Sequence, residues 1–441
     1  MDSIEEYITL HATQQPDREA IICGDERLTY AGLDERIEAR CAELRRQGFS
    51  AGQVVCLRAE SSIAFLTTYF ALHRIGCIAA PLEHDLPDDV FAAIEAELSR
   101  HSCPPGTADV LYTTGTTGRS KGVMISADTI LADAENLIAG QGFTPDLTFV
   151  INGPLNHIGS LSKVYPNILL GATIILVDGL KDLNRFFDTF ALRDTRYATF
   201  LVPASIRILI QFSAARLASL ADRIDFIETG AAAISESDMQ SLCKLLPTSR
   251  LYNTYASTET GIIATYDWNS GECTSGCLGT PMPNSQVFIT ADGRIACKGR
   301  TLMTGYIGAP ERTATILRDA TIYTSDLGTI DAQGRLHLKG REDDIINVGG
   351  FKVAPTEVEE AALSHPTVKD CICTAVPHKI TGQALRLIVV LNAGSALDKR
   401  SIALHLRQKL EAFKVPALYE TAEAIRRTFN GKLDRKSYRH G

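Results

Sequence analysis

Residues Leu111–Ser126 carry the sequence LYTTGTTGRSKGVMIS, which is the most informative stretch of the chain. Glycines let the backbone come close to an anion, and hydroxyl, N–H and ammonium groups can bind phosphate oxygens. The residues that offer these groups are Thr113, Thr114, Gly115, Thr116, Thr117, Gly118 and Lys121. The spacing does not fit the Walker A pattern GxxxxGKS/T, and no GxGxxG supports a dinucleotide fold. The residues alone leave two interpretations open, a phosphate-binding turn and a polar hairpin turn without a ligand.

The composition is that of an ordinary globular protein. The 441 residues are 45% hydrophobic and 22% charged, and their net charge of -8 gives no nucleic-acid footprint. Eleven cysteines form no zinc-ligand spacing, so we expect reduced structural thiols. Acidic residues in MDSIEEYITL argue against a signal peptide, and no apolar run is long enough for a membrane span. We therefore expect a cytoplasmic protein that binds neither membranes nor nucleic acid.

Helical and strand patterns alternate over the first three quarters of the chain, which predicts βαβ units in an α/β fold with a largely parallel sheet. Helices are expected at Leu33–Gln47, Ser62–His73 and Ser205–Phe212. Strands are expected at Gly52–Ala59, Cys77–Pro81, Ala172–Val177, Ala198–Val202 and Phe226–Thr229. The apolar run Ile168–Val177 is interpreted as a buried strand with its flanking turn.

The last hundred residues predict a separate α+β unit. Thr356 and Glu359 fit a capping box at the start of a helix, and strands follow at Val368–Val376 and Leu385–Leu391. A second helix is expected over Arg400–Phe413. The charged run GREDD makes a poor core, so we predict a large domain over residues 1–340 and a small domain over 344–441.

Several motifs in a fixed order resemble those of the adenylate-forming superfamily of acyl-CoA synthetases, adenylation domains and luciferases. TTGTTGRSKG is similar to its phosphate loop, and PLNH at Pro154–His157 to its acid-site motif. YASTE at Tyr255–Glu259, YTSD at Tyr323–Asp326, GREDDII at Gly340–Ile346, GGFKV at Gly349–Val353 and NGKLDR at Asn430–Arg435 follow. Ser120, Ala256 and Ser325 replace the usual Pro, Gly and Gly, Arg294 replaces a frequent Glu, and the stretch after Pro81 is short.

The resemblance implies a role for each matching residue. Thr113–Thr117 and Lys121 would hold phosphates, Gly230, Ala231 and Ala232 would pack along adenine, and Tyr255 would stack on it. Thr258 would contact the α-phosphate, Asp326 the ribose, and Arg341 the ribose or phosphate. Glu259 and Thr117 would bind Mg²⁺, and Lys432, Glu259 and His157 would be catalytic. The small domain would be mobile about a hinge at 341–343 with Asp343 as the hinge residue, and Gly349 and Gly350 would line the thiol tunnel.

By this resemblance the protein would use ATP and Mg²⁺ to form an acyl-AMP, and coenzyme A would then take the acyl group. PLNHIGSLSK lacks the Asp that binds an amino acid's ammonium group, so a fatty or aryl acid is favoured. Apolar residues at Val202–Ala204 and Ile262–Ile263 are compatible with such an acid or with core packing. A free-standing enzyme that loads an acyl carrier protein and a non-catalytic nucleotide-binding relative remain alternatives. A monomer or a homodimer is expected.

Overall fold

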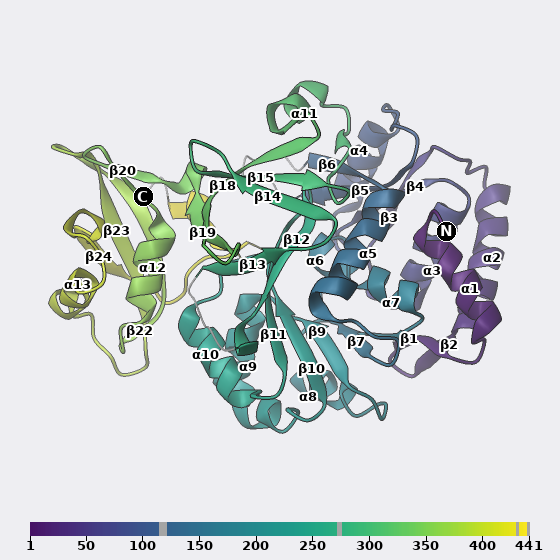
Figure 1. The fold of residues 1–441 in the computed structure, drawn as a ribbon, viewed down its shortest axis with the longest axis horizontal. Coiled ribbons are helices and arrows are strands. Elements are labelled where there is room, and N and C mark those ends of the chain that lie inside the picture. Colours follow the sequence, from purple (N-terminus) through teal and green to yellow (C-terminus); the bar gives the residue numbers. More distant parts are fainter. Residues whose placement is uncertain (114–120, 271–275, 429–431, 439–441) are drawn as a thin grey trace.

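The computed structural model describes residues 1–113, 121–270, 276–428 and 432–438 of the chain. These residues form a large α/β body and a smaller α+β unit at its side, which lies at the left of Figure 1. The predicted fold class is therefore confirmed. No helix in the described ranges is long and apolar enough to cross a bilayer.

The main sheet runs through the whole large body. In spatial order its strands are β14 (Ser285–Ile289), β15 (Arg294–Gly299), β18 (Thr321–Ile330), β19 (Leu336–Arg341), β13 (Cys277–Pro281), β12 (Gly261–Asp267), β11 (Arg250–Ser257), β10 (Ile224–Thr229), β9 (Tyr197–Phe200), β7 (Thr148–Ile151), β8 (Thr173–Leu176), β1 (Glu19–Cys23) and β2 (Glu26–Thr29), with β17 (Leu317–Arg318) beside β18. The stretch from β1 through β8, β7, β9 and β10 to β11 is parallel, as the alternating pattern predicted.

A second sheet packs beside the main sheet. Its order is β16 (Gly305–Tyr306), β6 (Lys121–Ser126), β5 (Thr107–Thr113), β4 (Ile78–Leu82) and β3 (Val54–Arg58). One hydrophobic core joins the two sheets through the helices α1 (Ile4–Gln14), α2 (Tyr30–Arg46), α3 (Ile63–Arg74), α5 (Ala127–Gln141) and α7 (Val164–Leu170). The opposite face of the main sheet packs on α8 (Leu183–Thr189), α9 (Pro203–Ala218) and α10 (Glu236–Leu245) (Figure 1). Short α4 (Asp88–Leu98), α6 (Ile158–Leu161) and α11 (Pro310–Ile316) complete this body with the turn η1 (Trp268–Ser270).

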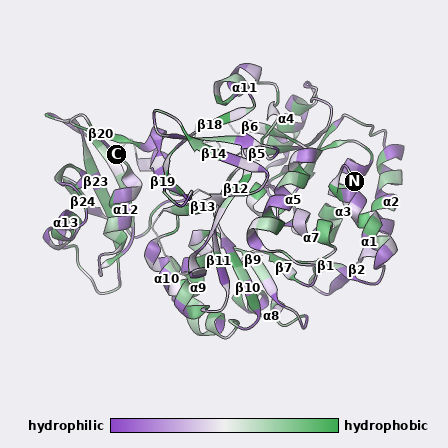
Figure 2. Ribbon diagram, viewed as in Figure 1, coloured by the Kyte–Doolittle hydropathy of each residue, from purple (hydrophilic) through white to green (hydrophobic). Residues whose placement is uncertain are grey.

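Hydrophobic periodicity explains several of these elements. Leu33, Ile37, Cys41 and Leu44 of α2 are buried on one face, as their spacing predicted. Strands of the parallel stretch are buried on both faces, and Figure 2 shows largely hydrophobic residues along β9 and β10.

The C-terminal unit has its own sheet and core. Its strands are β21 (Phe351–Val353), β20 (Ile346–Val348), β23 (Gly382–Leu391) and β22 (Val368–His378), with β24 (Leu418–Thr421) parallel to β23. Helices α12 (Pro355–Leu363) and α13 (Lys399–Arg407) pack on it, and the short turns are η2 (Glu342–Asp344), η3 (Ala412–Lys414) and η4 (Arg435–Tyr438). The exact boundaries at 340 and 343 stay predictions.

Three local predictions were wrong. Ile168 belongs to α7, which Gly171 ends with a left-handed φ of 70°, so the strand starts only at Thr173. No capping box forms, because Pro355 begins α12 and the Glu359 side chain turns into the core to meet Arg435. The last predicted helix ends at Arg407 rather than Phe413, and Phe413 lies in η3.

A glycine in β13 is required by a close backbone approach. Gly279 has a φ of 76°, and a Cβ atom there would lie 1.8 Å from the Thr265 carbonyl oxygen. Gly293 has a similar φ of 84° but open space around it. Gly293→Ala should cost roughly 1–2 kcal/mol for the left-handed backbone alone.

Gly279→Ala should cost about 1–3 kcal/mol more than Gly293→Ala, because the new methyl group overlaps fixed backbone. The measurement is the urea concentration at the unfolding midpoint of the large domain for both variants. Equal midpoints for the two variants would contradict the tight approach of β13 to β12.

Candidate active site

The predicted phosphate loop connects two paired strands. Thr113 and Lys121 are the last register partners of the antiparallel strands β5 and β6, and the rest of the predicted phosphate loop lies between them in the sequence. Thr114, Gly115, Thr116 and Thr117 fall outside the described residues, and their predicted contacts are not tested. The Lys121 ammonium lies 5.0 Å from the centre of the Tyr306 ring. Burial lowers the pKa of Lys121, and the nearby charge of Arg312 lowers it further while Glu259 opposes the shift.

Glu259 is held by a residue that sequence reasoning missed. The Tyr306 hydroxyl donates to Glu259 Oε1 at 2.8 Å, and strand β16 fixes Tyr306 by pairing with β6. Thr258 and Glu259 lie in the turn between β11 and β12, which hydrogen bonds between Ser257 and Thr260 close. The carboxylate of Glu259 offers a hard oxygen ligand, the kind that Mg²⁺ prefers.

The described ranges contain no group of three or more His, Cys, Asp or Glu side chains arranged for a metal. Mg²⁺ in nucleotide sites uses one or two carboxylates plus substrate phosphates, so one carboxylate at Glu259 fits this mode of binding. The other predicted metal ligand, Thr117, lies in the undescribed loop.

Asp326 is the centre of a second cluster. The Tyr255 hydroxyl donates to Asp326 Oδ2 at 2.6 Å, and Arg341 Nε lies 3.3 Å from Asp326 Oδ1. Asp326 and Arg341 face each other in the β18–β19 register, and the Arg341 guanidinium also donates to Ser325 at 2.6 Å. Burial and then the Asp326 charge raise the pKa of Tyr255, so its hydroxyl keeps its proton. The strand pairing thus brings together three residues that are widely separated in sequence.

Lys432 reaches this centre from the C-terminal unit. Lys432 is exposed to solvent, and desolvation by the protein around it lowers its pKa. The charge of Arg341 lowers the pKa further, whereas Asp326 and Glu259 oppose the shift. Lys432 therefore lies within electrostatic range of the charged groups of both clusters.

His157 lies on the same side of the site. Burial lowers the pKa of His157 to about 4, and the charge of Lys432 adds to this effect. The imidazole is therefore neutral at pH 7 and can line the site as an uncharged polar group. His157 immediately precedes α6.

The predicted adenine loop follows β10. Ala231 has a φ of 65°, a conformation that costs a residue with a Cβ atom of the order of 1–3 kcal/mol. A Cβ at Gly230 would lie 3.0 Å from the Thr254 carbonyl oxygen, so a larger residue here would require the backbone to shift slightly. The loop is thus held close to β11, where Tyr255 lies.

The two predicted thiol-tunnel residues, Gly349 and Gly350, belong to the C-terminal unit. Gly349 and Gly350, with φ of 61° and 95°, form the two-residue turn between β20 and β21 and are exposed. Their amides donate to Thr381 and Asn347 of the same unit. Asp343 is exposed in η2, close enough to Lys121 to affect its pKa.

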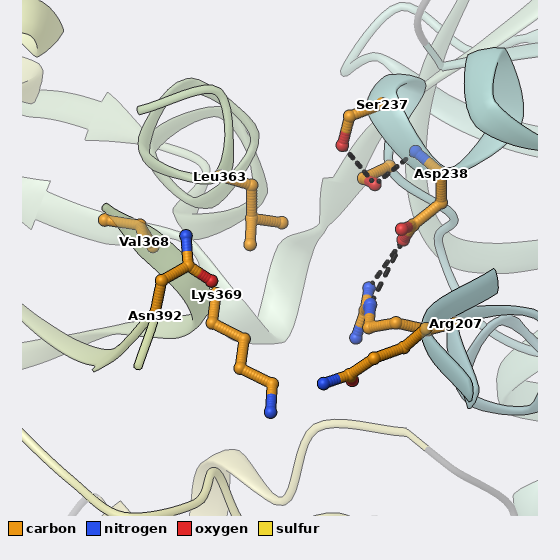
Figure 3. A pocket seen from close by; sticks show the side chains of 9 residues that line it. Arg207, Ser237, Asp238, Leu363, Val368, Lys369 and Asn392 are labelled. Atoms are coloured by element: carbon orange, nitrogen blue, oxygen red, sulfur yellow. Dashed lines mark hydrogen bonds and ion pairs between the residues drawn. The ribbon is translucent and has the colours of Figure 1, made fainter. Parts of the chain in front are cut away.

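A cavity of about 280 Å³ separates the two units away from these residues. Figure 3 shows Arg207, Ser237 and Asp238 of the large body on one side and Leu363, Lys369 and Asn392 of the small unit on the other. Arg207 donates to Asp238 at 2.8 Å and lies 3.9 Å from Asp370 across the cleft. The units touch here through polar contacts rather than through a shared apolar core.

Comparison with known proteins identifies the class of enzyme. The family model of the AMP-binding enzymes matches residues 8–99 and 99–307, and the model of their C-terminal domain matches residues 357–432. The chain belongs to the AMP-binding enzyme family. The resemblance inferred from the motifs is therefore confirmed.

The relatives are similar over nearly their whole length. A feruloyl-CoA synthase from Amycolatopsis sp is 27% identical, covering 96% of this chain and 95% of the relative. A 2-succinylbenzoate–CoA ligase from Bacillus cereus (strain Q1) is 26% identical, covering 100% and 99%. ATP-bound MatB from Rhodopseudomonas palustris has the same fold, with a TM-score of 0.89 at 23% identity and 99% coverage of both chains. The predicted enzyme class, an AMP-forming acid–thiol ligase, agrees with these relatives.

The Tyr306 hydrogen bond predicts a role in holding Glu259. Tyr306→Phe removes the donor but keeps the ring beside Lys121, so the carboxylate should be less well oriented. We expect the Mg²⁺ concentration for half-maximal pyrophosphate release to rise about three- to tenfold, the loss of one hydrogen bond of roughly 1 kcal/mol.

The control variant is Tyr419→Phe, because the Tyr419 hydroxyl has no hydrogen-bond partner among the described residues. A Tyr306→Phe enzyme with the Mg²⁺ dependence of the parent would show that Tyr306 does not position Glu259.

Proposed function

We propose that the protein uses ATP and Mg²⁺ to convert a carboxylic acid into an acyl-AMP, and then transfers the acyl group to the thiol of coenzyme A. The observation that carries this proposal is that Lys432 of the C-terminal unit lies within electrostatic range of Arg341, Asp326 and Glu259 of the large body. The related feruloyl-CoA and 2-succinylbenzoate–CoA ligases support an acid and coenzyme A as substrates.

In the first step a carboxylate oxygen of the acid attacks the α-phosphorus of ATP, and pyrophosphate leaves. No proton has to move, so positioning and charge neutralisation dominate the catalysis. Lys432 and Lys121 supply positive charge, and Mg²⁺ on Glu259 would neutralise phosphate charge. Asp326 accepts the ribose hydroxyls, and Tyr255 and Arg341 hold its carboxylate in place.

In the second step the sulfur of the thiol attacks the acyl carbon, AMP leaves with the bonding electrons, and the thiol proton goes to solvent. The amides of Gly349 and Gly350 hydrogen-bond to Thr381 and Asn347 of their own unit. We propose that the small domain rotates about residues 341–343, with Asp343 as the hinge residue, to bring this turn to the site.

Two thiols could accept the acyl group from the acyl-AMP. Coenzyme A is favoured, and an acyl carrier protein is the alternative acceptor. We also propose a cytoplasmic monomer or homodimer.

The proposal is tested by carboxylate-dependent pyrophosphate release over a panel of fatty, aryl and amino acids, with and without coenzyme A. We expect steady turnover with an aryl or fatty acid only when coenzyme A is present. Release that coenzyme A does not affect would favour a carrier-protein acceptor, and no release with any acid would favour a non-catalytic relative.

Lys432 is expected to act in only one of the two steps. Lys432→Ala should lower acyl-AMP formation at least about a hundredfold, the typical effect of removing a donor at the transition state. Thiol attack on supplied acyl-AMP should be nearly unchanged. The control is Lys436→Ala, an exposed lysine of the same segment. Equal loss of both half-reactions would contradict the proposed role.

A further inference from the structure

A buried ion pair lies outside the residues assigned to ATP. Lys163 Nζ lies 2.8 Å from Glu228 Oε1, and the two side chains are 0% and 1% exposed. Lys163 immediately precedes α7, and Glu228 is near the end of β10. Buried charge pairs contribute little net stability and are costly when incompletely hydrogen-bonded, so this pair calls for an explanation beyond folding.

The pair is incompletely hydrogen-bonded. Glu228 Oε2 is fully buried and has no hydrogen-bond partner in the described part of the chain. The hydroxyl of Ser162, which neighbours Lys163, is likewise buried and without a partner there. An unpaired buried acceptor costs about 1–3 kcal/mol, and such groups are retained where a ligand supplies the missing donor.

The pair is close to the proposed path of the acid. Glu228 and Phe200 are register partners on neighbouring strands, so their side chains share one face of the sheet. Lys163 Nζ lies 5.4 Å from the centre of the Phe200 ring. A Cβ atom on Gly159, two residues after His157, would lie 3.2 Å from the same ring. Phe200 thus links the ion pair to the turn that follows His157.

The adenine loop lies on the other side of this ring. A Cβ atom on Gly230 would lie 3.7 Å from Phe200. An acid whose carboxylate is at the α-phosphate, beside His157 and this loop, would therefore extend its remote end toward Phe200 and the pair behind it.

The charges and hydrogen-bonding groups of Lys163 and Glu228 determine which substrate group they can bind. The positive and negative charges cancel, and burial raises the pKa of the neighbouring Asp133 to about 8, so that carboxyl group is largely protonated at pH 7. A charged remote group would find no net counter-charge. A neutral hydroxyl can donate to Glu228 Oε2 and accept from Lys163, which has further N–H donors. An acid with an alkyl group at its remote end would leave Glu228 Oε2 without a hydrogen bond.

We propose that the acid carries a hydroxyl group at the end remote from its carboxylate, and that Lys163, Glu228 and Ser162 select it. This inference rests on the proposed acid-activating function and narrows its substrate class. It disfavours a plain fatty acid, which the apolar residues around the site had allowed.

The test compares matched acids with and without the hydroxyl: para-hydroxybenzoate and benzoate, para-hydroxycinnamate and cinnamate, omega-hydroxyhexanoate and hexanoate. We expect kcat/KM for pyrophosphate release to be at least about tenfold higher for the hydroxylated member of at least one pair, because a site built for a hydroxyl rejects its analogue. Calorimetric binding of the same acids in the absence of ATP gives a readout that does not depend on catalysis.

The matched variant is the double substitution Lys163→Met with Glu228→Leu, since apolar replacement of a buried pair is often neutral for stability. We expect it to reduce the hydroxyl preference to within about twofold of unity. Ser162→Ala is a milder variant that should lower the preference partially if the double variant does not fold. The control is Tyr197→Phe, which removes a buried hydroxyl that donates to the Arg193 carbonyl oxygen and should leave the preference unchanged.

The outcomes separate this inference from the proposed function. Pyrophosphate release with no hydroxyl preference in any pair, unchanged in the double variant, would overturn the inference and leave the function in place; the buried oxygens would then be held by water. Hydroxyl-dependent binding without any release would support the inference and overturn the function. Neither binding nor release with any of these acids would count against both.

Discussion

Two hydrogen bonds between Arg435 and Glu359, at 2.6 and 2.7 Å, fix where the end of the chain lies. Glu359 is buried at 5% exposure in α12, and Arg435 also donates to the Cys373 carbonyl oxygen. Breaking such a pair by removing one partner leaves a buried charge and costs about 3–5 kcal/mol. Because Lys432 is only three residues before Arg435, this pair sets the reach of the lysine. The proposed catalytic centre thus depends on an interaction in the core of the other unit.

The large domain prepares its half of the centre through strand register. The β18–β19 pairing sets Asp326 opposite Arg341, and the β6–β16 pairing brings Tyr306 to Glu259. Because strands hold these groups, little reorganisation is needed in the proposed reaction when charge develops on the phosphate. The small unit adds one lysine, and the contacts between the units near Arg207 are polar and leave a cavity. A polar interface of this kind suits an enzyme whose two steps need two orientations of the same domain.

Sequence patterns predicted the structural features that depend on residues close together in the chain. The spacing of Leu33, Ile37, Cys41 and Leu44 predicted the buried face of α2, and the alternation of elements predicted the parallel sheet. Motif order predicted Tyr255, Asp326, Arg341 and Lys432, which the structure brings together, although their roles stay predictions. Tyr306 and the pair Lys163–Glu228 could not be predicted, because they arise from contacts across strands and helices that no local spacing encodes. The capping box failed for the same reason: a tertiary partner, Arg435, competes for Glu359.

We propose that the orientation of the small domain decides which step the enzyme performs. The direct measurement joins Arg207→Cys and Lys369→Cys, on opposite walls of the interdomain cavity, with a short bismaleimide crosslinker. The crosslinked enzyme should form one equivalent of acyl-AMP at close to the rate of the same variant before crosslinking, and should make no thioester. Crosslinked enzyme that makes thioester as fast as the uncrosslinked variant would contradict the account, because one domain orientation would then serve both steps.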